Sequence, residues 1–225
     1  MSYILRDMPP ELPADLRRKA ERAETATIGH RRFMGFADSA IQAMLPGKRA
    51  VGTAVTLALP GQDSTLLHHI VQFLRPGDVL VIDRLGDRRH ACLGGGVSCA
   101  IKQRGVAGVV IDGPCTDLPE IEAYDLPVWA RGPSPITTRL YDIGGAFNVE
   151  ICCGGAVVRP GDVVLCDFSG VLAMPRDEAE ADIDWALGVQ EAEIGLQEAV
   201  KGGAALGERS GASAKVMAKR ATRSG

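Results

Sequence analysis

The chain has 225 residues, with 25 Lys and Arg against 28 Asp and Glu, which gives a formal net charge of −3. Hydrophobic residues make up 46% and charged residues 24%, which is typical of a folded protein and excludes global disorder. Because there is no basic surplus and aromatic residues are only 4%, we expect no nucleic-acid partner.

The sequence also predicts the compartment of the protein. No apolar run approaches the roughly 18 residues that cross a bilayer, and residues 1–24 contain no apolar signal segment. Six cysteines lie among apolar residues without C-x-x-C spacing, and neither the His68-His69 nor the Cys152-Cys153 pair has zinc-ligand spacing. We therefore expect free thiols in a reducing cytoplasm, and no membrane partner.

Two helices are predicted before the first strand, over residues 16–24 and 37–45. Strands and helices then alternate as far as residue 130. The predicted strands cover residues 50–59, 78–83, 107–112 and 127–130, and the predicted helices cover 64–74, 91–104 and 119–123. Continuous apolar strands that alternate with helices are typical of a parallel sheet covered by helices, so the fold class is α/β.

From residue 148 the pattern changes to short strands separated by glycine turns, which indicates a small β layer. These strands are expected over 149–153, 156–158, 162–167 and 170–174. A long helix is predicted over 176–201, and the Gly/Ala/Ser-rich remainder to residue 225 is expected to be a frayed tail. The chain therefore divides into a core at 1–175 and a helix with a flexible tail at 176–225.

The long predicted helix is strongly acidic, because residues 177–200 carry eight acids and no base. One interpretation is a solvated acidic face. The other is a helix that docks on a neighbouring subunit and delivers a carboxylate there.

A glycine turn, Gly94-Gly95-Gly96-Val97, follows the strand at 78–83 and begins a predicted helix. Ligands of open α/β sheets bind at the carboxyl ends of strands, and a helix N-terminus favours an anion. A small carboxylate or phosphate would fit here, neutralised by Arg84, Arg88 or Arg89. The alternative is that the glycines only allow close helix packing.

Two further polar segments follow strands of the same predicted sheet. Asp112 and Asp117 lie after the strand at 107–112, and such carboxylates suit Mg²⁺, which takes few protein ligands. Asp117 could instead be the N-cap of the next helix. The loop from Arg131 to Arg139 is either a third part of the site or a connection. The four histidines are interpreted as packed or solvated.

Four segments resemble the RraA-like family: PGDVLVID (76–83), GVAGVVIDGPCTDLPEI (105–121), PVWARGPSP (127–135) and GGAVVRPGDVVLCDFSGVLAMPR (154–176). That family contains the 4-hydroxy-4-methyl-2-oxoglutarate aldolases, which also decarboxylate oxaloacetate, and the regulator of ribonuclease E activity. The resemblance implies a three-layer α/β/β swivelling-type domain with a parallel sheet, a small β layer and a C-terminal helical arm. It also implies a homotrimer or hexamer with active sites between subunits.

The resemblance assigns roles to individual residues. In the aldolases a D-G-x-x-R-D pattern supplies an Arg for the pyruvyl substrate and an Asp for Mg²⁺. Asp117 matches the metal Asp, whereas Thr116 replaces the Arg. Gly94 to Val97 match the loop whose amides bind the substrate carboxylate, without its acidic side chain. An acid from a neighbour's C-terminal helix reaches the metal through water, and Glu191 is the nearest match, with Glu193 next.

We therefore expect a lyase of the class II aldolase type that depends on Mg²⁺ (or Mn²⁺). Its substrate is expected to be a small 2-oxo acid of the 4-hydroxy-4-methyl-2-oxoglutarate or oxaloacetate type, and its product pyruvate. Because a Thr hydroxyl cannot replace a bidentate guanidinium, either the substrate differs or Arg88, Arg89 or Arg139 supplies the clamp. The alternative is a non-catalytic regulatory or binding protein of the ribonuclease-regulator type, which the missing Arg at position 116 favours.

Overall fold

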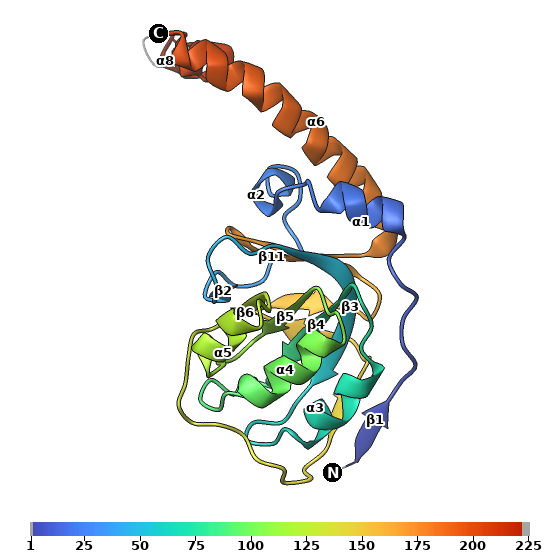
Figure 1. The fold of residues 1–225 in the computed structure, drawn as a ribbon. Helices are drawn as coiled ribbons and strands as arrows, with labels where there is room; N and C mark the ends of the chain where they lie inside the picture. Colours follow the sequence, from blue (N-terminus) through green and yellow to red (C-terminus); the bar gives the residue numbers. More distant parts are fainter. Residues whose placement is uncertain (1, 222–225) are drawn as a thin grey trace.

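The computed structural model describes residues 2–221. A nine-stranded sheet has the order β1-β7-β3-β4-β5-β6-β2, with β10 paired to β3 and β11 paired to β10 (Figure 1). Its strands are β1 (Tyr3–Leu5), β2 (Gln42–Ala43), β3 (Ala50–Ala58), β4 (Asp78–Asp83), β5 (Gly108–Ile111), β6 (Val128–Ala130), β7 (Gly145–Phe147), β10 (Val163–Asp167) and β11 (Gly170–Met174). A separate hairpin joins β8 (Ile151–Cys153) to β9 (Ala156–Val158).

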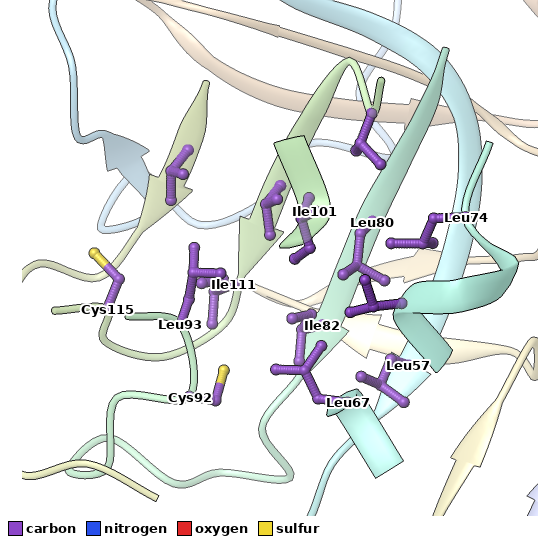
Figure 2. Close-up of a cluster of buried hydrophobic side chains, with 14 of the residues drawn as sticks. Leu57, Leu67, Leu74, Leu80, Ile82, Cys92, Leu93, Ile101, Ile111 and Cys115 are labelled. Carbon is purple, nitrogen blue, oxygen red and sulfur yellow. The ribbon is translucent and has the colours of Figure 1, made fainter. Parts of the chain in front are cut away.

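The centre of the sheet is parallel, as predicted, because β3 to β6 pair in one direction. Three helices cover one face: α3 (Thr65–Ile70), which continues into the 3-10 turn η1 (Val71–Phe73), α4 (Gly95–Gln103) and α5 (Leu118–Ala123). Leu67, Leu80, Ile101 and Ile111 belong to the apolar core on this side (Figure 2). Burial of such side chains stabilises each by about 1.5–3 kcal/mol, which fixes the helices on the sheet.

The other face of the sheet carries a second β layer. The β8–β9 hairpin and strands β10 and β11 enclose a core around Trp129. The indole Nε1 of Trp129 donates a hydrogen bond to the Asp167 carbonyl at 2.9 Å. The three-layer α/β/β prediction is therefore confirmed, although β10 and β11 are continuous with the main sheet through β3 rather than a separate unit.

Three further helices lie on the outer side of β10 and β11: α1 (Ala14–Ala20), α2 (Thr25–Ile28) and α6 (Arg176–Lys201). Acidic side chains in the first half of α6 form ion pairs within the chain, Glu180 with Lys19 at 3.0 Å and Asp182 with Arg32 at 2.9 Å. The rest of α6 extends away from the body as an arm (Figure 1). Within residues 2–221, no helix combines the length and apolar character needed to cross a membrane.

Two predicted segments differ from the structure. Residues 37–45 form turns around β2 instead of a helix, because Ile41 is buried and the Met44 amide donates to the Val128 carbonyl at 2.8 Å. Part of the predicted tail is helical, as α7 (Leu206–Arg209) and α8 (Ala212–Ala221), while residues 222–225 lie outside the described residues. All six cysteines are free, as expected.

Candidate active site

The glycine turn and Asp117 meet where β4 and β5 end. One carboxylate oxygen of Asp117, Oδ2, accepts a hydrogen bond from the Gly95 amide at 2.8 Å. The Thr116 hydroxyl lies 3.3 Å from the other oxygen, Oδ1, and the Thr116 amide donates to the Leu93 carbonyl at 2.9 Å. Because β4 and β5 are neighbouring parallel strands, the loops that follow them lie side by side, as the sequence predicted.

Asp117 precedes α5 but makes no side-chain capping bond to it. Its backbone is left-handed, with φ of 54°, and its carboxylate caps the neighbouring helix α4 instead. Gly94 permits this contact, because a Cβ at that position would lie 2.7 Å from Asp117 Oδ2. The sequence offered Asp117 as the N-cap of the helix that follows it. The structure shows that its side chain caps α4 instead of α5.

The first turn of α4 keeps two amide groups available. Among residues 2–221, the N–H groups of Gly96 and Val97 have no hydrogen-bond partner. A Cβ at Gly96 would meet no atom within 4 Å, so the turn faces open space. Unpaired amides and the helix dipole at this end favour an anion, such as a substrate carboxylate.

A cleft of about 550 Å³ runs from this turn along α4, within the range typical of small-molecule sites. Its walls come from α3 with η1, from α4, and from the loops after β5 and β6. The residues that line it include Ser64, His68, Val71, Gln72, Gly94, Gly95, Gly96, Val97, Ala100, Arg104, Thr116, Asp117, Thr137 and Thr138. The cleft therefore contains the glycine turn, Thr116 and Asp117 together.

The three arginines expected to replace the missing clamp are not among the residues that line this cleft. Arg88 forms an ion pair with Asp112, and Arg89 has an exposed side chain. Arg139 donates to the Thr137 hydroxyl at 2.8 Å. Sequence reasoning missed Arg104, which does line the cleft. The available signal was its position seven residues after Val97, directly after the end of α4 and in line with the same helix face.

The carboxylate of Asp112, the second acid expected near the metal, is bound by other groups of the protein. Its Oδ1 accepts hydrogen bonds from Arg88 and from Arg131 Nε, the latter at 2.5 Å, and its Oδ2 accepts one from the Gly154 amide at 2.8 Å. Burial raises the pKa of Asp112, the Gly154 amide opposes that rise, and the nearby Asp38 adds to it. Asp112 therefore joins the loops after β4, β5 and β6 to the β8–β9 hairpin.

Arg84 lies completely buried in the loop after β4. Its guanidinium donates to the Gly61 carbonyl and, at 3.4 Å, to the His90 carbonyl. In the described chain its Nε and Nη1 have no partner. From the sequence, Arg84 was one of the three cations expected to neutralise an anion. In the structure it lies beneath the loop and is not among the residues that line the cleft.

Asp63, which sequence reasoning missed, fixes one wall of the cleft. Its Oδ1 accepts hydrogen bonds from the Thr65 amide at 2.9 Å and the Tyr141 amide at 3.0 Å, and its Oδ2 accepts one from the Ile143 amide at 2.9 Å. Although burial raises its pKa, these donors and the Thr65 hydroxyl lower it to about 2. The Asp-Ser-Thr run at the start of the predicted helix was the available signal.

Glu191 belongs to α6, which extends from the side of the molecule away from α4 and α5 (Figure 1). It lines a second groove with Arg22 and Gln190. A contribution of Glu191 to the cleft therefore requires a second subunit.

Carboxylate groups beside the cleft are the candidate ligands for Mg²⁺. Among residues 2–221, no group of three or more His, Cys, Asp or Glu side chains is arranged to hold a metal ion. Mg²⁺ keeps several waters and takes one or two carboxylates. Asp117 offers Oδ1, and Glu120 follows one helical turn later, with its Cγ 3.3 Å from where a Cβ of Gly95 would lie. This donor set fits a hydrated divalent ion.

Comparison with known proteins identifies the chain's relatives. Residues 25–173 match the model of the RraA-like family, described as Aldolase/RraA. A protein of Halalkalibacterium halodurans, provisionally named a 4-hydroxy-4-methyl-2-oxoglutarate aldolase, is 34% identical over 63% of this chain and 67% of its own length. An uncharacterised protein of Methanocaldococcus jannaschii is 30% identical over 68% of this chain and 74% of its own.

A solved structure from Streptomyces coelicolor shares the fold. It superposes with a TM-score of 0.73 at 27% identity and covers 85% of this chain and 98% of its own. That protein is RraAS2, an unusual member of the RNase ES inhibitor RraA protein family.

Proposed function

The chain belongs to the RraA-like family, and from that premise we propose that it is a carbon–carbon lyase that depends on a divalent metal and acts on 2-oxo acids. The observation that carries this proposal is the contact of Asp117 with the first turn of α4, beside the free amides of Gly96 and Val97. A metal-binding carboxylate and an anion-binding turn are the two features that a 2-oxo acid requires.

Asp117 would hold the metal through its carboxylate, and Glu120 and Thr116 would bind its waters. When bound, Mg²⁺ or Mn²⁺ would act as a Lewis acid that polarises the 2-oxo group while the adjacent carbon–carbon bond breaks. The Gly96 and Val97 amides would bind the substrate carboxylate and orient it. The substrates would be of the 4-hydroxy-4-methyl-2-oxoglutarate or oxaloacetate type, with pyruvate as product.

The proposed enzyme is a homotrimer or hexamer in which the arm of one subunit approaches the cleft of the next. Glu191 from the neighbour would then supply a second acid near Asp117. The support is that the arm is exposed over most of its length. Light scattering at micromolar concentration tests this point, and a 23.8 kDa species alone would contradict it.

The second candidate is a non-catalytic regulatory protein. Thr116 favours it, because a hydroxyl stands where the family's aldolases have an arginine. Loss of a buried charge-assisted contact lowers affinity on the order of a hundredfold or more. This candidate predicts the same assembly without pyruvate release.

Pyruvate release separates the two candidates. The purified protein is supplied with oxaloacetate and a panel of 4-hydroxy-2-oxo acids, and pyruvate is followed by a coupled reduction, with Mg²⁺ or with EDTA. The lyase proposal expects release that Mg²⁺ supports and EDTA abolishes. Equal rates with and without protein for every acid would favour the regulatory candidate.

A further inference from the structure

We propose that Arg104 binds a second anionic group of the substrate at the end of the cleft opposite the glycine turn. The cleft would then take an elongated 2-oxo acid with an apolar middle and a terminal carboxylate. This inference rests on the proposed function for the identity of the 2-oxo end, whereas the role of Arg104 rests on the cleft itself.

The shape of the cleft follows from two parallel helices. The strands before α3 and α4 are neighbours and parallel, so both helices begin at the same edge of the sheet and run side by side. Val97 and Ala100 lie on one face of α4, and Arg104, the residue directly after the helix, continues that face at a spacing of four residues. They line the cleft opposite His68 and Val71 of α3 and η1. The cleft is therefore elongated along the helices.

The charge at its far end comes from Arg104. It is the one Lys or Arg among the described residues that line the cleft. Its Nε donates to the Leu74 carbonyl at 3.0 Å, which orients the guanidinium, and no acid in the described chain forms an ion pair with it. Arg75, next to Leu74, is by contrast paired with Asp78 at 3.0 Å. Arg104 thus keeps a fixed and unneutralised positive charge.

The separation of the two ends defines the ligand's length. Arg104 follows Gly95 by nine positions, which places their Cα atoms about 13 Å apart along the helix axis. A helical side chain leans toward the N-terminus, so the Arg104 guanidinium is closer to the glycine-turn amides than this. A four-carbon diacid would occupy only the glycine end. A chain of six to eight carbons would reach both ends and pass Val71, Val97 and Ala100.

The middle of the cleft suits such a chain, because these three side chains are apolar and offer methylene groups a dry surface. The glycine-turn amides lie at one end of this apolar strip, and Arg104 lies at the other. A monocarboxylic 2-oxo acid of equal length would leave Arg104 without a partner. Chain length and terminal charge are therefore the two properties that the cleft selects.

Calorimetric titration of the intact protein tests the inference in the presence of Mg²⁺. The probes are 2-oxo diacids of five to eight carbons and the 2-oxo monoacids of the same lengths. We expect the longer diacids to bind at least about tenfold more tightly than their matched monoacids. Arg104→Gln should reduce that ratio to about one.

Lys102→Gln is the matched control, because it removes one positive charge from the same helix at a side chain directed to the Asp125 carbonyl at 2.8 Å. It should keep the diacid preference. A wild-type protein without this preference, an Arg104→Gln variant that retains it, or equal loss in Lys102→Gln would each overturn the inference. Binding with the expected preference, but without pyruvate release from oxaloacetate or any 4-hydroxy-2-oxo acid, would overturn only the lyase proposal.

Discussion

The Oδ2 atom of Asp117 lies 2.8 Å from the Gly95 amide nitrogen, so this carboxylate caps a helix that belongs to the preceding strand–helix unit. The contact joins the loop after β5 to the first turn of α4. It also holds the negative charge of Asp117 next to free backbone amides, at the point where a metal and a carboxylate would both bind.

Gly94 should be sensitive to the smallest substitution. Its φ of −132° is permitted for alanine, so Gly94→Ala is opposed by steric contacts alone, at 2.7 Å from Asp117 Oδ2 and 3.0 Å from Thr116 Cγ2. We expect a loss of about 1–3 kcal/mol in the free energy of unfolding. Gly96→Ala is the control, because its Cβ meets nothing within 4 Å, and it should be neutral or stabilise by up to about 1 kcal/mol. Urea denaturation compares them; equal stabilities would refute the steric argument.

Acid should loosen the wall of the cleft through Asp63. Its pKa is about 2 in the folded protein against 3.8 ordinarily, so its stabilising effect is complete above pH 4. That contribution, roughly 2 kcal/mol, is lost as the pH falls from about 4 toward 2. Asp63→Asn should therefore lower the free energy of unfolding at pH 7 and flatten its decline below pH 4. If wild type and variant decline in parallel, Asp63 does not hold the loop.

Thr116→Arg tests whether the cleft still matches the family's aldolases. The Thr116 side chain borders the glycine turn and Asp117, so a guanidinium there would lie near the proposed carboxylate site. We expect the Michaelis constant for oxaloacetate to fall by about tenfold or more. Steady-state pyruvate release measures it, with Thr116→Gln as an uncharged control of similar length. Equal behaviour of the two variants would show that position 116 lacks the expected role.

Much of the fold could be predicted from local sequence patterns. The strand β4 and the helix α6 were predicted at their observed bounds, because a continuous apolar run and a helix after Pro175 are readable within one window of sequence. Strand β7 and the pairing of β10 with β3 were not predicted. Both depend on partners that are distant in the chain. In addition, β7 (Gly145–Phe147) is too short to show a hydrophobic periodicity.

The site likewise contains residues that could be predicted from the sequence and residues that could not. Asp117 and the glycine turn could be placed together because neighbouring parallel strands bring their loops to one edge. Arg104 could not, since its importance depends on the cleft between α3 and α4. Arg88 was a candidate for the substrate clamp in the sequence. Only the structure shows that its guanidinium is paired with Asp112.

Asp117→Asn tests the central claim most directly. Asparagine tolerates the φ of 54° and its amide oxygen can still accept from the Gly95 amide, so only the charge is removed. Asp125→Asn is the matched control. Asp125 also has φ of 54°, lies just after the end of α5, which Asp117 precedes, and is outside the cleft. Melting temperature and Mg²⁺-dependent pyruvate release are measured for both.

The account predicts melting temperatures within about 2 °C of each other, and a loss of turnover of about a hundredfold or more in Asp117→Asn alone. Pyruvate release by Asp117→Asn at the wild-type rate, with the same dependence on Mg²⁺, would contradict the assignment of this cleft as a metal-dependent lyase site.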